Sequence, residues 1–192
     1  MELTQQALEL SAYLAADEAV DHRHPLVART AARLRSSAGA EPESYARAAY
    51  EFVRDAVPHS YDSGDPRVAW RASDVLATRN GICYAKSHAL AALLRHAGIP
   101  AALCYQKLEV VHGLVAVKLP GRPWARQDPR GNRPGVDARF SLDGERLAYT
   151  PDPAAGQYDI PVLYAAPPAP VLDALRRSAD RTELDRLLPV SL

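Results

Sequence analysis

Residues 80–100, NGICYAKSHALAALLRHAGIP, decide how the rest of the chain must be arranged. The apolar run begins after Asn80-Gly81, a typical helix-start and turn signal, and ends at Gly98-Ile99-Pro100, a typical stop signal. The pattern therefore predicts a helix over 82–97. Because this helix has little polar surface, other elements must surround it on most sides, and we expect it at the centre of the domain.

Cys83 falls in the first turn of this helix. Unpaired backbone N–H groups and the positive end of the helix dipole favour an anion there, so Cys83 is a candidate nucleophilic thiolate. The alternative is that Cys83 is a small buried hydrophobic residue, as most free cysteines are. The second cysteine, Cys104, lies in a strand-like apolar run over 101–105, and its expected role is packing.

Charge and composition exclude several classes of partner. The 192 residues include 23 Lys and Arg against 23 Asp and Glu, for a formal net charge of +0, and neither sign forms a long run. We therefore expect no nucleic-acid or membrane partner. The first residues lack a basic region followed by an apolar stretch, and no segment approaches the roughly 20 apolar residues of a membrane span. With two cysteines only, a reduced, cytoplasmic location is expected.

The length fits a single domain, 1–192, with a helical N-terminal part over 1–57. In its last helix, apolar residues recur at intervals of three and four positions, which is typical of an amphipathic helix. A turn-rich loop follows at 59–66, and then a short capped helix. The predicted helices in the first half cover about 4–16, 25–37, 42–56 and 73–77.

After the central helix, the apolar period changes from helical to extended. This predicts an antiparallel sheet packed on the helices, an α+β fold whose core spans 73–150. Prolines then recur without period over 151–170, which indicates an irregular surface crossing, and short helical patterns end the third segment, 151–192. The predicted strands cover about 101–108, 111–119 and 124–128, with a weaker one at 145–149.

A short hairpin links His112 to Asp128. A turn centred between positions 120 and 122 places His112 opposite positions 128–132, with Asp128 at the edge of that window. A thiolate nucleophile needs an imidazole to carry its proton, and the imidazole needs an orienting carboxylate or amide. Singly, such a histidine is usually a packing residue and such an aspartate a turn former. Their order after Cys83 predicts a Cys-His-Asp site.

Several phrases of the chain are similar to those of the transglutaminase-like superfamily, in particular to small stand-alone bacterial members. These papain-related thiol enzymes carry Cys at the start of a central helix, and His and Asp on neighbouring strands. The similar phrases are GICYAKSH (81–88), LLRHAGIPA (93–101), CYQ (104–106), HGL (112–114) and DPRGN (128–132). The likeness as a whole extends over most of the chain, from the N-terminal helices to the Leu-rich tail.

The resemblance implies a papain-like fold with Cys83 as nucleophile, His112 as general base and acid, and Asp128 as the orienting residue. The chain departs from the pattern at Pro129, where alanine is expected. Because this departure bears on the angle of Asp128, Asp137 is the alternative orienting residue.

The donors that would stabilise a substrate oxyanion are less visible. The backbone N–H of Cys83 is the natural first donor, and the other oxyanion or cleft candidates are Gln106 and Tyr84. Gln106 is equally well explained as an ordinary strand amide. His59, Tyr61 and Asp62 precede the central helix and are candidates for the cleft wall, although a solvent-facing turn is the favoured interpretation of their loop.

No metal or cofactor is expected. Histidine and cysteine spacings do not match a zinc site, acidic residues do not match a calcium loop, and no Gly-rich phosphate loop is present. His88 points away from Cys83 on the helix and is not its base.

The predicted function is acyl transfer from an amide bond of a peptide, protein or small-molecule substrate through an acyl-enzyme on Cys83. Hydrolysis, as in a cysteine protease or amidase, and transfer to an amine both remain open, as does the oligomeric state. One alternative is a non-catalytic binding or scaffold domain that retains the fold. Another is an acyltransferase that resembles arylamine N-acetyltransferases.

Overall fold

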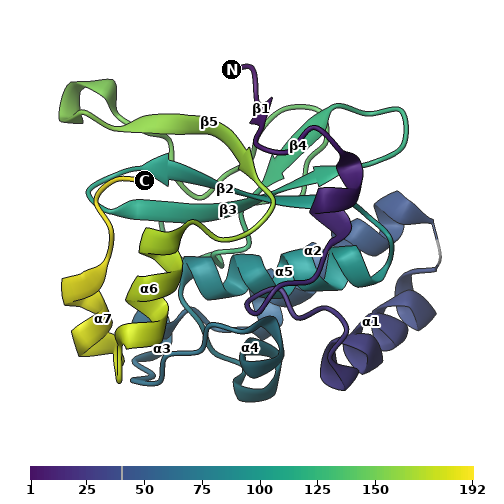
Figure 1. Ribbon diagram of the computed structural model, residues 1–192, viewed down its shortest axis with the longest axis horizontal. Helices are drawn as coiled ribbons and strands as arrows, with labels where there is room; N and C mark the ends of the chain where they lie inside the picture. Colours follow the sequence, from purple (N-terminus) through teal and green to yellow (C-terminus); the bar gives the residue numbers. More distant parts are fainter. Residues whose placement is uncertain (40) are drawn as a thin grey trace.

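In residues 1–39 and 41–192, which the computed structural model describes, seven α-helices pack on a five-stranded sheet (Figure 1). The helices are α1 (Pro25–Ala38), α2 (Pro42–Ala56), α3 (Ser60–Ser63), α4 (Ala72–Thr78), α5 (Cys83–His96), α6 (Ala169–Arg177) and α7 (Arg181–Leu187). The strands are β1 (Thr4–Gln5), β2 (Ala101–Lys107), β3 (Val111–Lys118), β4 (Trp124–Gln127) and β5 (Tyr158–Tyr164). Two 3-10 turns, η1 (Leu10–Leu14) and η2 (Pro153–Ala155), complete the elements.

The helix α5 lies at the centre, as its composition predicts. It contacts α1, α2 and α4 as well as strands β2 and β3, and twelve of its fourteen residues are buried, among them Leu90, Leu93 and Leu94. Two of its buried polar side chains donate to backbone carbonyls: His88 to Trp70 O at 2.8 Å, and Arg95 to Ala101 O. Such partners remove the cost of burying these groups.

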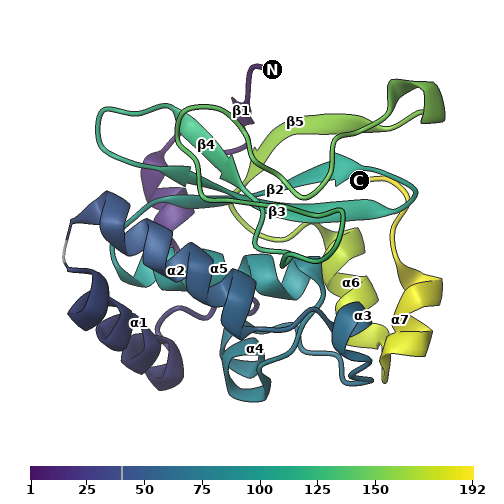
Figure 2. The same ribbon diagram turned by 180° about the vertical axis from the view of Figure 1, so that it is seen from behind.

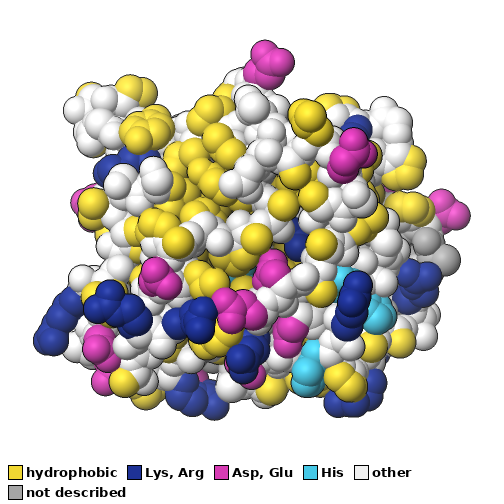
Figure 3. Space-filling view, viewed as in Figure 1, with side chains coloured by type: hydrophobic (Ala, Val, Ile, Leu, Met, Phe, Trp, Pro, Cys, Tyr) yellow, Lys and Arg dark blue, Asp and Glu magenta, His cyan; other side chains and the backbone are white. Residues whose placement is uncertain are grey.

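The sheet has the order β1-β5-β2-β3-β4. The strands β2, β3 and β4 pair antiparallel, with Cys104 opposite Leu114 and Val115 opposite Gln127. The helices cover one face of the sheet (Figures 1 and 2). In the face that Figure 3 shows, hydrophobic side chains gather over the sheet and charged ones lie mostly over the helices. The predicted α+β fold is confirmed, and the parallel pair β1–β5 makes the sheet mixed at one edge.

The prediction for the segment after β4 was wrong in two places. Residues 145–149 form no strand, and the fifth main strand, β5, lies inside the stretch expected to be irregular. Pro161 explains why β5 escaped detection: it has no N–H, and it lies where the β5–β2 register shifts, between the pairs Leu103–Tyr164 and Tyr105–Ile160. Figure 2 shows the connection between β4 and β5 passing in front of β3 toward α5.

The predicted N-terminal helix over 4–16 was also wrong, because only η1 is helical there. A contact with a residue far away in the sequence determines the path of this segment: the Tyr13 hydroxyl donates to Leu163 O at 3.1 Å and holds the chain against β5. The predicted helices over 25–37 and 42–56 agree with α1 and α2. Among the described residues, the structure contains no helix whose length and apolar character suffice to cross a membrane.

Candidate active site

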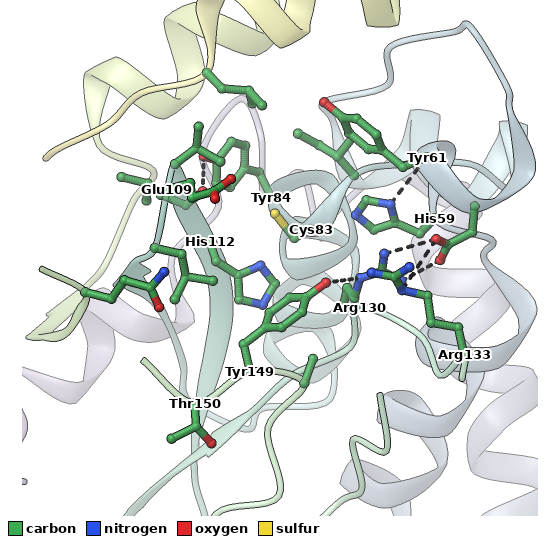
Figure 4. A pocket seen from close by; sticks show the side chains of 18 of the residues that line it. His59, Tyr61, Cys83, Tyr84, Glu109, His112, Arg130, Arg133, Tyr149 and Thr150 are labelled. Atoms are coloured by element: carbon green, nitrogen blue, oxygen red, sulfur yellow. Dashed lines mark hydrogen bonds and ion pairs between the residues drawn. The ribbon is translucent and has the colours of Figure 1, made fainter. Parts of the chain in front are cut away.

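Three separate elements bring Cys83, His112 and Asp128 together. Cys83 is the first residue of α5, His112 is the second residue of β3, and Asp128 directly follows β4. His112 donates from Nε2 to Asp128 Oδ2 at 2.9 Å, and the Cys83 thiol lies close enough to the imidazole to raise its pKa. His112 is 5% exposed, Asp128 is fully buried and Cys83 is half-buried. The thiol and the imidazole therefore face the same pocket (Figure 4).

Three further hydrogen bonds hold Asp128 in place. Its Oδ1 accepts from Arg130 N at 3.0 Å, and its Oδ2 accepts from Ala148 N at 2.9 Å in addition to His112. Its backbone carbonyl accepts from the Tyr50 hydroxyl at 3.0 Å. Pro129 lies inside the turn from Asp128 to Arg130, where its missing N–H is not needed. The departure at this position therefore leaves the carboxylate directed at His112.

In the buried pair of His112 and Asp128, each residue shifts the pKa of the other. Burial alone would lower the pKa of His112, but the negative charges of Asp128 and Cys83 and the hydrogen bond to Asp128 raise that pKa well above its ordinary value. Burial alone would raise the pKa of Asp128, but His112 and the two backbone N–H donors lower it. This arrangement favours an imidazolium beside a carboxylate at neutral pH.

Gly113 allows the first turn of α5 to approach β3. A Cβ atom at Gly113 would lie 2.8 Å from Tyr84 Cδ1, closer than real Cβ contacts, and 3.3 Å from Tyr84 Cα, which is also tight. Because Gly113 follows His112 and Tyr84 follows Cys83 in the chain, this close packing brings the imidazole to the thiol. Among the described residues, no protein oxygen accepts from the Cys83 N–H, as is typical of a helix start.

The site opens into a pocket of about 860 Å³. Tyr149 covers His112, with ring centroids 5.0 Å apart and an interplanar angle of 82°. The Tyr149 hydroxyl accepts from Arg130 Nε at 2.8 Å, and the Arg130 guanidinium makes a bidentate pair with Asp62. Leu188, which directly follows α7, adds part of the wall. Loops on several sides therefore complete a cleft whose floor comes from α5 and β3.

The structure separates the remaining candidates. Gln106 is fully buried and does not line the pocket, and its amide donates to Tyr149 O at 3.3 Å and Asp159 Oδ1 at 2.9 Å, so the oxyanion assignment has no support from its position. Tyr84 lines the pocket, but its hydroxyl donates to Val111 O. Asp137 is exposed and pairs with Arg139 instead of meeting His112.

Several pocket residues were missed or undervalued in the sequence analysis. His59, Tyr61 and Asp62 all line the pocket; Tyr61 and Asp62 are exposed, as expected for a solvent-facing turn, whereas His59 is buried. Arg130 belongs to the phrase DPRGN, which placed it close to Asp128 in the sequence. The phrase gave no indication that Arg130 would contact Tyr149. No local signal places Tyr149 over His112, because the contact depends on how the long β4–β5 connection folds back.

In the described ranges, 1–39 and 41–192, no group of three or more His, Cys, Asp and Glu side chains is placed to hold a metal ion. The polar groups of the pocket include a thiol, two imidazoles, three phenols and the paired charges of Arg130 and Asp62. These groups suit nucleophilic attack on a carbonyl, with proton transfer by an adjacent base.

The family model described as the transglutaminase-like superfamily matches residues 28–129. One similar solved structure is a candidate cysteine protease from Cytophaga hutchinsonii, with a TM-score of 0.50 and 16% identity over 65% of this chain and 43% of that one. Another is the periplasmic domain of TgpA from Pseudomonas aeruginosa, with a TM-score of 0.50 and 22% identity over 64% of this chain and 48% of that one. These likenesses concern the fold, and the matches span less than half of each solved chain. None of the curated proteins matches this chain.

Proposed function

This chain belongs to the transglutaminase-like superfamily, and on that basis we propose that it is a thiol-dependent enzyme that transfers acyl groups from amide bonds. Cys83 is the nucleophile, His112 the general base and acid, and Asp128 the orienting residue. The observation that carries this proposal is the double contact of His112, with Asp128 at 2.9 Å on one side and with Cys83 on the other. Such a relay is the recurring requirement of thiol acyl transfer.

In the first step, the Cys83 sulfur attacks the carbonyl carbon of the amide. A C–S bond forms, and the π electrons of the carbonyl move to its oxygen. As the oxyanion collapses, the C–N bond breaks and the leaving nitrogen receives the proton of the His112 imidazolium. The product is a thioester on Cys83 and a free amine.

In the second step, His112 removes a proton from water or from an acceptor amine as that molecule attacks the thioester carbonyl. The C–S bond breaks, and the acyl group leaves as an acid or as a new amide. The raised pKa of His112 supports the proton donation of the first step, and Asp128 keeps the ring nitrogens correctly directed. Half-buried Cys83 leaves room for either acceptor, so the partition between them is a property to measure.

The test is to trap the acyl-enzyme. Incubation of the protein with a cell extract, followed by intact mass analysis and peptide mapping, is expected to show a hydroxylamine-sensitive adduct on Cys83. Cys83→Ala is the negative control, and Cys104→Ala is the matched variant that keeps the adduct. Adding a primary amine then shows whether the acyl group passes to water or to the amine.

Two results would contradict the proposal. An adduct that persists in Cys83→Ala would place the chemistry elsewhere, and the absence of any adduct on Cys83 would favour a binding or scaffold role. If an adduct forms from acyl-CoA and from no amide, the protein is an acyltransferase with a thioester donor.

A further inference from the structure

His59 is a second imidazole in the pocket that the three proposed catalytic residues do not use. It lies 24 positions before Cys83, but backbone contacts hold it next to the start of α5. His59 forms an isolated parallel bridge with Gly81, and Ser60 N donates to Gly81 O at 3.2 Å. The segment around His59 is thus tied to the residue two positions before Cys83.

The side chain of His59 is fixed as well. Its Nδ1 accepts from the Tyr61 N–H at 3.4 Å and so caps the short helix α3. The His59 ring lies near the Tyr61 ring, with centroids 5.6 Å apart, and the residue is 8% exposed. Figure 4 shows the imidazoles of His59 and His112 approaching Cys83 from different directions, with the Nδ1 side of His59 turned toward Tyr61.

These contacts fix the tautomer of His59. Because Nδ1 accepts a hydrogen bond, the proton of the neutral ring must be on Nε2, the nitrogen that faces the pocket. Burial lowers the pKa of His59 to about 3, and the nearby positive charges of Arg130, Lys86 and His112 act in the same direction, against the weaker influence of Asp62. His59 is therefore a neutral N–H donor over the whole range in which a thiol enzyme works.

We propose that His59 is a catalytic residue that donates a hydrogen bond from Nε2 to the substrate carbonyl oxygen as this oxygen becomes an oxyanion, together with the backbone N–H of Cys83. The inference rests on the proposed acyl-transfer function and adds the missing second donor. Preorganised donors of this kind stabilise negative charge that develops in the transition state.

The chemistry suits a neutral imidazole better than a charged one. The proton stays on Nε2 throughout, so His59 neither takes the proton of Cys83 nor competes with His112 for the leaving amine. When the C–N bond breaks, the electron pair on the oxyanion returns to the carbonyl and the hydrogen bond weakens. A neutral histidine that polarises a carbonyl is an established catalytic device. The side chains of Gln106 and Tyr84 direct their donors to protein oxygens instead.

Two reactions of the same sulfur separate this role from a structural one. Acylation of Cys83 by p-nitrophenyl acetate passes through an oxyanion, whereas alkylation by iodoacetamide does not. His59→Phe keeps a ring without the donor, and His59→Asn keeps an acceptor for the Tyr61 N–H but is too short to replace Nε2. His59→Gln offers a longer amide donor.

We expect acylation to fall about 10²- to 10³-fold in His59→Phe and His59→Asn, the usual effect of removing one oxyanion donor. Alkylation should keep the wild-type rate, which also reports that Cys83 and His112 remain paired, and His59→Gln should recover part of the acylation. If His59→Phe loses alkylation through misfolding, His59→Asn decides the question.

Wild-type acylation rates in variants that keep normal alkylation would overturn the role of His59 and leave the proposed function intact. Equal loss of both reactions in His59→Asn would also overturn it, because the residue would then act on the thiol or the fold. A wild-type protein that p-nitrophenyl acetate acylates no faster than Cys83→Ala would overturn the proposed function itself, and the inference with it.

Discussion

The two cysteines of this chain lie in opposite environments. Cys83 is the first residue of α5 and is half-buried, and the His112 imidazole lines the same pocket. Cys104 lies in the middle of β2 and is fully buried in the smaller apolar cluster, which also contains Tyr13, Leu114 and Leu163. Burial raises the pKa of the Cys104 thiol, which favours its neutral form.

A nearby cation does not by itself activate a thiol. The positive charge of Arg126 acts to lower the pKa of Cys104, yet burial outweighs it, and Arg126 pairs closely with Glu145 and Asp159. Cys83 differs because its partner is an imidazole that can both give and take a proton, and because it faces a pocket. The comparison shows that a neighbouring imidazole and exposure to a pocket, more than local positive charge, distinguish the two thiols.

The largest expected effect is on acyl transfer. Cys83→Ala should abolish it, a loss on the order of 10⁴-fold or more, because the nucleophile is removed. The fold should remain, since a half-buried small side chain is lost, and thermal unfolding followed by circular dichroism checks this. Cys104→Ala is the matched control and should keep activity. The reverse pattern would reassign the catalytic thiol.

Asp128→Asn should lower acyl transfer by about 10²- to 10⁴-fold, because the orientation and charge of His112 depend on this carboxylate. Since the negative charge of Asp128 favours the protonated imidazole, its removal should also lower the pKa of His112. An NMR titration of the His112 ring measures the shift. Cys83→Ala should shift the pKa in the same direction, and an unchanged value in both variants would refute the polarised relay.

Gly113→Ala tests how the strand that carries His112 meets α5. The added Cβ would clash with Tyr84 at 2.8 Å, so we expect a loss of about 1–3 kcal/mol in unfolding free energy together with reduced alkylation of Cys83. Gly121→Ala is the control. Gly121 has φ 70° in the β3–β4 turn, so alanine there costs stability but leaves the site unchanged. Equal effects of both variants on alkylation would count against the close-approach argument.

The smallest effect concerns the packing thiol. Cys104→Ser should destabilise the fold by about 1–3 kcal/mol, because a hydroxyl without a partner replaces a buried sulfur, and Cys104→Ala should cost less. Urea unfolding monitored by tryptophan fluorescence measures both values. Acyl-transfer activity should remain in both variants. A serine variant as stable as wild type would show that this site is more polar than its apolar neighbours indicate.

Sequence signals within a few neighbouring residues correctly predicted the elements whose structure depends on nearby residues. The start and stop signals of α5 and the apolar period of α2 determine these helices within one or two residues. The short turn after β3 sets the register that directs Asp128 toward His112. Three segments of the candidate site were thus predictable because one helix start and one hairpin position them.

The segments that were not predicted depend on contacts with residues far away in the sequence. Residues 145–149 were predicted as a weaker strand, but Ala148 N donates to Asp128 and Glu145 pairs with Arg126 instead of joining a ladder. Likewise Tyr13 holds the N-terminal segment on β5, which no helical period can reveal. Tyr149 and His59 reach the pocket through such contacts, and for this reason the walls of the site were harder to predict than its floor.

The most direct test of this account compares the two thiols in one experiment. Native protein is treated with iodoacetamide at pH 7, and the alkylation rates of Cys83 and Cys104 are followed by peptide mass analysis, in wild type and in His112→Ala. Cys83 should react much faster than a small reference thiol, Cys104 should stay unmodified until the protein unfolds, and the advantage of Cys83 should vanish in His112→Ala. A Cys83 that reacts no faster than the reference thiol, or equally fast in both proteins, would contradict the account.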